Sequence, residues 1–333
     1  MPINAKRMNI LSKPSELAAI TKNVVFAAGF FDGVHIGHRK LIQEAKAIAL
    51  QSGAELWVLS FEPHPLFVVK PEFCPKLITP LNLRLELLEA CGVDGCLLLP
   101  FTKELAQTSP EAFCEQCFSY WYNEGMHCTI VSGPNWRFGH NQSASIRDVE
   151  GLTRNQVSAH IVEGVEYNSE LVSSSRIRQA LLGGDLQNAN AMLGYYYTIC
   201  KKSIPERGVG TKIGFPTANI IFSGELMPPN GVYVTRVTLP REAIPENSKN
   251  TFFAVANLGF RPTFPNARPD APVLELHLLD FDLPISLNGL ELYVEYIKFI
   301  RRERKFDSPE ELVRQIKEDI IKAREAAASL SDK

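Results

Sequence analysis

Two histidines stand where a buried strand is expected to end and a helix to begin. Residues 29–38 read Gly-Phe-Phe-Asp-Gly-Val-His-Ile-Gly-His, which sets His35 and His38 around Gly37. The first turn of a helix offers free N–H groups and positive potential to an anion. Because Gly33 and Gly37 lack a Cβ, the backbone can approach a ligand closely. The spacing predicts a phosphate-binding turn, and a plain helix start with two solvent-exposed histidines is the alternative.

A second group of polar residues lies in the other half of the chain. Residues 216–219 read Pro-Thr-Ala-Asn, so Thr217 and Asn219 share one face of an expected strand. Further on, Glu275 and His277 alternate with leucines and also share a face. Pro216 fixes φ and removes a backbone donor, which is unusual at the start of a strand. Taken alone, the pattern indicates an edge strand followed by a solvent-facing glutamate.

The first half of the chain alternates between strand-like and helix-like patterns. Strands are expected at 24–29, 55–61, 95–99 and 128–132, and helices after residue 36 and at 81–91, 110–122, 174–182 and 185–193. Such alternation requires crossover connections and a parallel sheet covered by helices. We therefore predict an α/β, Rossmann-like domain over residues 1–185.

From residue 195 the pattern changes to strands without helices between them. The expected strands are 195–200, 216–221, 231–238, 252–257, 273–280 and 290–300. Proline, glycine and asparagine separate them, as turns of an antiparallel sheet require. A final helix is expected with Ser308 at its N-cap and Pro309 in its first turn. We predict a small antiparallel β-barrel with a C-terminal helix over residues 186–333.

Composition excludes several classes of protein. The 333 residues carry a formal net charge of -2, which argues against a dedicated nucleic-acid binder. No apolar run approaches the roughly 20 residues that span a bilayer, so no membrane partner is expected. The N-terminal stretch has no apolar signal region, which favours the cytoplasm.

The seven cysteines are scattered and odd in number, unlike a secreted disulfide framework. Cys114 and Cys117 form one Cys-x-x-Cys pair, which is compatible with redox chemistry or half of a zinc site. No second such pair is present, and we interpret both as core residues of a helix.

The stretch 29–38 is similar to the His-x-Gly-His signature of a nucleotidyltransferase superfamily. More narrowly, it resembles the flavin-adenylylating domain of prokaryotic bifunctional riboflavin kinase/FAD synthetases. Three further segments match that family in order: Phe-Glu-Pro-His-Pro at 61–65, Gly-Pro-Asn-Trp-Arg-Phe-Gly at 133–139, and Ser-Ser-Ser-Arg-Ile-Arg at 173–178. The resemblance departs at Phe30, where the family often has asparagine.

This resemblance implies transfer of the adenylyl group of ATP to the phosphate of FMN. That phosphate is already anionic, so catalysis requires positioning and charge neutralisation rather than a base. The implied catalytic residues are His35, His38 and Arg178, of which Arg178 offers a permanent fork of donors. The implied binding residues are Gly29, Phe31, Asp32, Gly33, Gly37, Asn135, Ser174 and Ser175.

The second half resembles the riboflavin kinase barrel, from about Tyr197 into the final helix. The resemblance implies ATP and Mg²⁺ as requirements, with Thr217 and Asn219 holding the metal and Glu275 taking the proton of the riboflavin hydroxyl. Gly208, Gly210 and Arg301 are the remaining implied nucleotide-binding residues.

The phosphate loop of the barrel departs from the family. Lys201 and Glu206 occupy expected glycine positions, Thr211 stands where arginine is usual, and the usual Asp-Leu-Tyr-Gly turn is altered to Leu-Asn-Gly at 287–289. A carboxylate facing ATP would repel it.

Two main hypotheses follow. In one, the enzyme makes FMN and then FAD from riboflavin and ATP. In the other, it is an FAD synthetase only, with a weakened flavin-binding barrel. An adenylyltransferase for a pantetheine phosphate is disfavoured by the barrel, and a non-enzymatic flavin sensor is disfavoured by the histidines.

Overall fold

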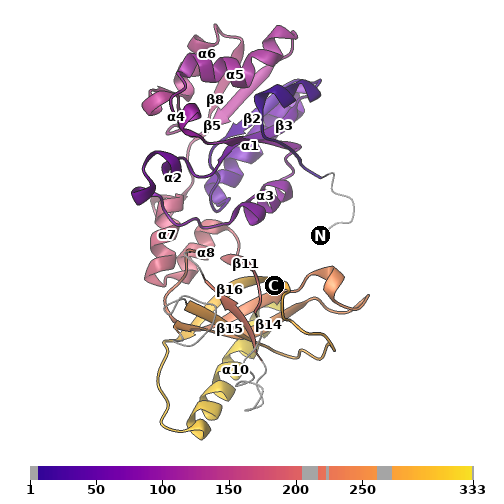
Figure 1. Cartoon of the computed structure of the whole chain (residues 1–333), viewed down its shortest axis with the longest axis vertical. Coiled ribbons are helices and arrows are strands. Elements are labelled where there is room, and N and C mark those ends of the chain that lie inside the picture. Colours follow the sequence, from indigo (N-terminus) through magenta and orange to yellow (C-terminus); the bar gives the residue numbers. More distant parts are fainter. Residues whose placement is uncertain (1–6, 205–216, 223–224, 261–271, 332–333) are drawn as a thin grey trace. The chain divides into compact units, whose positions relative to one another are not determined.

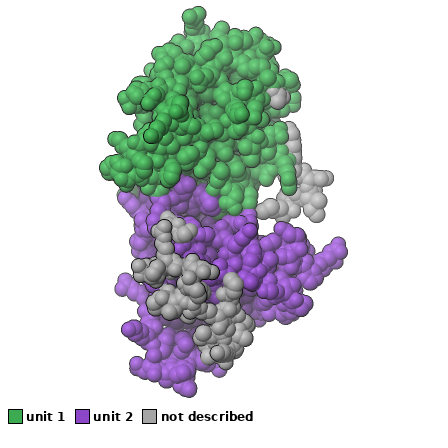
Figure 2. Space-filling view, in the orientation of Figure 1, with its two compact units in different colours: residues 1–75, 81–173 green, residues 76–80, 174–333 purple. Residues whose placement is uncertain are grey.

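The computed structural model describes residues 7–204, 217–222, 225–260 and 272–331. The chain divides into two compact units, one of residues 1–75 with 81–173, the other of 76–80 with 174–333 (Figure 2). The short segment 76–80 therefore belongs to the second unit although the first unit surrounds it in sequence. Each unit is described by itself.

The first unit is built on a six-stranded parallel sheet. Its strands lie in the order β1-β4-β3-β2-β5-β8, and Figure 1 labels β2, β3, β5 and β8 of this sheet. Their bounds are β1 (Asn9–Leu11), β2 (Val24–Ala28), β3 (Glu55–Glu62), β4 (Gly95–Pro100), β5 (Cys128–Ser132) and β8 (Val157–Ile161). The alternating pattern thus led to the correct α/β class, but β1 and β8 were not predicted.

Helices cover both faces of this sheet. All five residues of β2 are buried, and successive side chains enter opposite cores. Phe26 packs with residues of α5 (Pro110–Asn123), whereas Val25 packs with those of α1 (Ile36–Ser52). A strand covered on both faces has to be apolar throughout, because neither face meets water.

Shorter elements complete the first unit. They are α2 (Pro65–Val69), α3 (Leu81–Ala90), α4 (Lys103–Ala106), α6 (Val149–Leu152), β6 (Arg137–Phe138), β7 (Ala144–Ser145), β9 (Glu166–Tyr167), β10 (Glu170–Leu171), and the 3₁₀ turns η1 (Pro14–Ala19), η2 (Pro71–Phe73), η3 (His140–Gln142) and η4 (Ile146–Asp148).

The second unit begins with α7 (Ser174–Gly183) and α8 (Leu186–Leu193) and continues as an antiparallel sheet. The strand order is β11-β16-β13-β14-β15-β12. Their bounds are β11 (Thr198–Lys202), β12 (Ala218–Ile221), β13 (Gly231–Thr238), β14 (Thr251–Phe260), β15 (Pro272–Leu278) and β16 (Glu291–Arg301), with a 3₁₀ turn η5 (Arg241–Ala243). An antiparallel bridge between Ile204 and Asn219 links the two outer strands, so the sheet is nearly closed into the predicted barrel.

One helix, α10 (Pro309–Ser331), packs against strands β13, β14 and β16 of the barrel. The predicted N-cap is confirmed, because Ser308 Oγ accepts a hydrogen bond from the N–H of Glu311 at 3.2 Å. Apolar residues including Val232, Val234 and Ala323 form the core between barrel and helix.

Cys114, Cys117 and Cys128 are free and buried in the first unit, in agreement with the interpretation of Cys114 and Cys117 as core residues. Burial raises the pKa of the Cys114 thiol to about 12, which makes it a poor nucleophile at neutral pH. Within the parts of the chain that the structure describes, no helix is both long and apolar enough to cross a membrane.

Candidate active sites

The turn between β2 and α1 has an unusual backbone. Phe31 and Val34 adopt the left-handed region with φ of 60° and 35°, and Gly33 does so with φ of 82°. Non-glycine residues adopt this region at a cost of about 1–2 kcal/mol each, and a β-branched valine is an outlier there. Both side chains are fully buried, so surrounding contacts hold the turn in this conformation.

His35 ends this turn as the N-cap of α1. Its Nδ1 accepts a hydrogen bond from the N–H of His38 at 3.3 Å, so a neutral His35 carries its proton on Nε2. The two imidazole rings stack with centroids 3.6 Å apart. A Cβ on Gly37 would lie 3.2 Å from the His35 ring, so glycine leaves room for this arrangement. The alternative of two exposed histidines is wrong for His35, which is 5% exposed.

His38 is held in its neutral form. Burial of its ring, followed by the neighbouring His35, keeps the pKa of His38 well below its ordinary value of 6.5. Its Nδ1 is buried and has no hydrogen-bond partner among the described residues. The two stacked rings therefore lie at a helix start, where ring N–H groups and free backbone N–H groups suit the binding of a phosphate oxygen.

The first two motifs meet at the carboxyl edge of the parallel sheet. The ring of Phe30 contacts that of His64 edge-on, with centroids 4.4 Å apart. Gly29 donates its N–H to Leu59 O at 3.1 Å, which continues the pairing of β2 with β3. Ligands of open parallel sheets bind at this edge. Asp32 is 2% exposed within the same turn.

Asn135 lies on the loop that follows β5, the neighbour of β2 in the sheet, and its side chain is exposed. Beside it, the rings of Trp136 and Phe138 stack at 4.9 Å. The aromatic pair anchors the loop while leaving the amide of Asn135 accessible to a ligand.

Ser174, Ser175 and Arg178 lie on α7 and belong to the second unit. Ser175 is exposed, whereas Ser174 and Arg178 are half-buried. Arg178 Nε donates to the carbonyl of Lys76 at 2.8 Å, so this arginine ties the segment 76–80 to the start of α7. The histidines and these α7 residues thus belong to different units.

The kinase-like residues form a row across the barrel. Asn219 of β12 stands directly opposite Glu275 of β15, and Glu275 stands opposite Asn257 of β14. Directly opposed residues of antiparallel strands share a face with Cβ atoms about 5 Å apart. The leucines beside Glu275 are buried on the other face, as predicted. The sequence does not place Asn257 beside Glu275, because the register between distant strands cannot be read from it.

One buried oxygen atom of this site has the chemistry of a ligand for a hard cation such as Mg²⁺. Asn219 is 3% exposed, and its Oδ1 has no hydrogen-bond partner in the described residues. A buried acceptor oxygen without a donor is the kind of ligand that a hard cation needs. Among the described residues, no group of three or more His, Cys, Asp or Glu side chains could hold a metal by itself. Magnesium commonly takes one or two protein ligands plus substrate phosphates.

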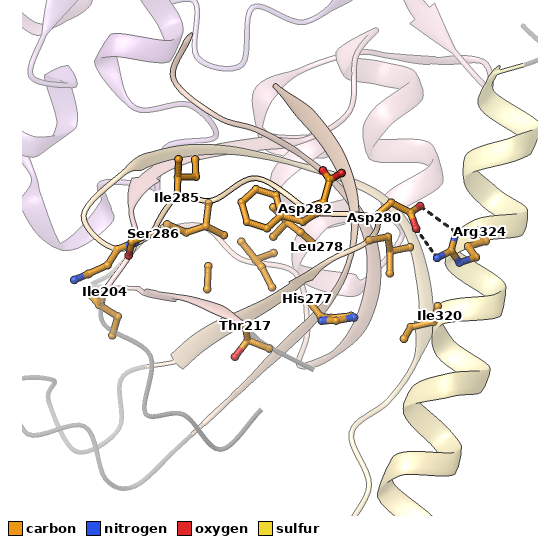
Figure 3. Close-up of a pocket in the computed structure, with 16 residues that line it drawn as sticks. Ile204, Thr217, His277, Leu278, Asp280, Asp282, Ile285, Ser286, Ile320 and Arg324 are labelled. Carbon is orange, nitrogen blue, oxygen red and sulfur yellow. Dashed lines mark hydrogen bonds and ion pairs between the residues drawn. The ribbon is translucent and has the colours of Figure 1, made fainter. Parts of the chain in front are cut away.

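A cavity of about 610 Å³ opens beside Thr217 and His277 (Figure 3). Its opposite wall is formed by the segment after β15, including Asp282, Ile285 and Ser286 (Figure 3). The ion pair of Asp280 and Arg324, at 2.7 Å, borders it near α10. Asn219 and Glu275 do not line this cavity, but their sequence neighbours Ala218 and Leu276 do.

The altered phosphate loop lies only partly within the described residues. Gly208, Gly210, Glu206 and Thr211 lie outside the described residues. Lys201 pairs with the carboxylate of Glu225 on the barrel. The changed turn at 287–289 is tied to Ser203, whose Oγ donates to Leu287 O and whose carbonyl accepts from Gly289 N at 3.1 Å.

Arg301 is engaged within the protein. Its Nη2 and Nε donate to Asp319 Oδ2 of α10 at 2.7 and 3.0 Å, and its Nη1 donates to the carbonyl of Arg302 at 3.1 Å. Gln315 Nε2 donates to the same carboxylate at 3.0 Å. Asp319 is 1% exposed, so these contacts join β16 to α10 in the interior.

Comparison with known proteins also divides the chain into two parts. The FAD synthetase family model matches residues 17–176, and the riboflavin kinase family model matches residues 193–327. A crystal structure from Streptococcus pneumoniae, described as a macrolide-efflux protein, has a TM-score of 0.80 and 27% identity, and the match covers 96% of this chain and 99% of that one.

Similar proteins span nearly the whole chain. The bifunctional riboflavin kinase/FMN adenylyltransferase of Bacillus subtilis is 35% identical over 298 residues, covering 89% of this chain and 90% of that protein. Those of Listeria monocytogenes and Escherichia coli K12 are 34% and 31% identical, covering 93% and 90% of this chain and 94% and 92% of theirs. This chain belongs to the family of bifunctional riboflavin kinase/FMN adenylyltransferases.

Proposed function

We propose that the enzyme phosphorylates riboflavin to FMN at the Asn219–Glu275 row and adenylylates FMN to FAD at the His35–His38 pair, with ATP as co-substrate in both steps. The proposal rests on one observation. The two sites follow each other in a single chain, and relatives that match most of this chain are named for both activities. This favours the bifunctional hypothesis over an FAD synthetase with an inactive barrel.

In adenylyl transfer, a phosphate oxygen of FMN attacks the α-phosphorus of ATP, and the bond to the β-phosphate bridging oxygen breaks to release pyrophosphate. His35 and the neutral His38 hold the triphosphate through ring N–H groups at the start of α1. We assign the permanent charge of Arg178 and the hydroxyls of Ser174 and Ser175 to the phosphates of ATP. We assign Asn135 and the turn of Gly29, Phe31, Asp32, Gly33 and Gly37 to nucleotide and flavin binding.

In the kinase step, the 5′-hydroxyl of riboflavin attacks the γ-phosphorus of ATP and ADP leaves. A hydroxyl must lose its proton during attack, and Glu275 accepts it. Thr217 and Asn219 would hold a magnesium ion, which would neutralise charge on the transferred phosphoryl group. The cavity beside Thr217 has the volume of a nucleotide-sized ligand site and accommodates part of the substrates. Gly208 and Gly210 are assigned to the ATP phosphates.

Arg301 fits a supporting role in this unit better than direct contact with a ligand. All three of its nitrogen groups already donate to Asp319 or to a backbone carbonyl. We place the reactions in the cytoplasm, where ATP is available, with riboflavin, FMN and ATP as the ligands of the enzyme.

A product assay tests this function. Purified protein is incubated with riboflavin, ATP and Mg²⁺, and the flavins are separated by chromatography. We expect FMN to form first and FAD to follow. Formation of FAD only when FMN is supplied would support the inactive-barrel hypothesis, and absence of both products even with FMN would refute the proposal.

A further inference from the structure

A buried arginine lies behind the His35–His38 turn. Arg84 of α3 is 1% exposed, and its guanidinium donates to three acceptors of the first unit. Nη1 donates to Phe30 O at 3.3 Å, and Nη2 donates to Phe61 O at 3.2 Å and to Glu62 Oε2 at 2.6 Å. The guanidinium also lies 4.3 Å from the centroid of the Phe30 ring.

These acceptors lie at the carboxyl ends of two neighbouring strands. Phe30 lies two residues after the end of β2, and Phe61 and Glu62 end β3, which pairs with β2 in parallel. Ser60 Oγ donates to the same Phe30 carbonyl at 3.2 Å. Arg84 and Ser60 therefore fix, from behind, the point where the chain leaves the sheet and enters the strained turn.

The turn leads directly to the histidines. Phe31, whose φ is 60°, contacts the ring of His38 edge-on at 5.1 Å. Val34, whose φ is 35°, precedes His35, and its carbonyl accepts a hydrogen bond from Arg39 Nε at 3.1 Å. A shift of the Phe30 carbonyl would therefore move the imidazoles as well, because the buried residues Phe31 and Val34 connect them.

The burial of a charged side chain does not by itself explain why a position would stabilise the fold. Desolvation of a guanidinium is costly, and a well-packed apolar side chain commonly stabilises such a position as well or better. A planar fork with several donors can instead hold separate acceptors at fixed mutual positions. The residues it holds here are those that set the geometry of the adenylyl-transfer turn.

We propose that Arg84 is a positioning residue for adenylyl transfer, holding the carboxyl ends of β2 and β3 so that His35 and His38 stay aligned. This inference rests on the proposed function of that turn. Arg84 acts through Phe30 and needs no contact with substrate. Small misplacements of catalytic groups reduce turnover by up to about 100-fold, so its loss should be visible in kcat.

The test uses the full-length enzyme with Arg84→Met, Arg84→Lys and Ser60→Ala, and with Arg147→Met as a matched loss of an exposed arginine from the same unit. We expect kcat for FAD synthesis from FMN to fall about 100-fold in Arg84→Met and less in the other two, with KM values changed less than about threefold. Riboflavin phosphorylation in the same preparations is expected to stay unchanged, as are both activities of Arg147→Met.

Rates are expressed per folded molecule, using tryptophan fluorescence, because all three tryptophans lie in the first unit. Spectra of ¹⁵N-labelled imidazoles give a second readout that does not depend on activity. We expect the His35 and His38 ring signals to shift in Arg84→Met and not in Arg147→Met. Should Arg84→Met not fold, Arg84→Lys and Ser60→Ala decide by the same two readouts.

Wild-type kcat in folded variants, together with unchanged histidine signals, would overturn the role of Arg84. A purely structural role would lower the folded fraction while leaving kcat per folded molecule intact. If the wild-type enzyme makes no FAD, the proposed function itself fails, an outcome distinct from the failure of Arg84 alone.

Discussion

Asn219 and Glu275 face each other directly across β12 and β15, although 55 residues separate them in the sequence. The Oδ1 atom of Asn219 is buried without a hydrogen-bond partner among the described residues, and Glu275 is half-buried on the same face of the sheet. An oxygen ligand and a carboxylate base are thereby fixed on adjacent strands of a rigid barrel. Such an arrangement keeps the metal and the reacting hydroxyl at a constant separation.

Replacement of Glu275 by glutamine should abolish the kinase step selectively. The amide cannot accept the hydroxyl proton, so we expect riboflavin phosphorylation to fall by about 10²- to 10⁴-fold. FAD synthesis from supplied FMN is expected to stay at the wild-type rate. Glu291→Gln, an exposed site on β16, is the control. Normal FMN production by Glu275→Gln would remove Glu275 from the mechanism.

Replacement of Asn219 by alanine should weaken the use of magnesium. The variant lacks the buried amide oxygen, so we expect the Mg²⁺ concentration for half-maximal kinase activity to rise at least severalfold. The Mg²⁺ dependence of FAD synthesis from FMN serves as the internal control. An identical kinase titration curve for variant and wild type would exclude Asn219 as a metal ligand. Chelation of the metal with EDTA is expected to stop the kinase reaction in both.

His38→Ala should show the opposite selectivity to Glu275→Gln. Removal of one preorganised donor to developing phosphate charge costs about 10²- to 10³-fold in turnover. We expect that loss in FAD synthesis, with riboflavin phosphorylation intact. His127→Ala, an exposed histidine just before β5, should retain both activities. Loss of both activities in a folded His38→Ala protein would contradict two separate sites.

The stability of the first unit should fall in mild acid because of His38. Burial keeps the pKa of His38 well below 6.5, so below that pH the unfolded chain binds a proton that the folded chain does not. The contribution of His38 to the free energy of unfolding is therefore fully present above about pH 7 and decreases as the pH is lowered through 6.5. One such histidine contributes up to about 1.4 kcal/mol per pH unit.

Urea unfolding followed by tryptophan fluorescence, at pH 5.5 and 7.5, measures this effect. The decrease between the two pH values should be smaller in His38→Gln than in wild type, because the other histidines are common to both proteins. Equal decreases would show that His38 does not resist protonation.

The buried ion pair of Arg301 and Asp319 should contribute to the stability of the second unit. Asp319→Ala leaves Arg301 without its carboxylate, and breaking a buried pair in this way costs about 3 kcal/mol. Asp280→Ala breaks an exposed pair with Arg324 and should change the unfolding midpoint little. Denaturation followed by circular dichroism measures both. A midpoint for Asp319→Ala equal to that of Asp280→Ala would refute the structural role of this pair.

Much of the fold was predictable because it depends on local periodicity. The strands Cys128–Ser132 and Gly231–Thr238 have the bounds that the pattern predicted, since apolar runs and turn residues mark them within a few positions. The strand Asn9–Leu11 was missed because its three residues, two of them exposed, carry too little pattern to register. The proximity of His35 and His38 was equally local, since three residues on a helix start define it.

Only the tertiary structure decided the rest. Arg84 lies in a helix whose sequence does not distinguish a buried guanidinium from an exposed one, and its burial results from packing against β2 and β3. Arg301 is the same residue type in the sequence, but its guanidinium donates to Asp319 on α10. The sequence by itself determined which residues could do chemistry and in which half of the chain, because residue type and short-range spacing are enough for that. Register and the burial of charge depend on contacts between distant segments, so the Asn219–Glu275 row and the role of Arg84 emerged only from the folded chain.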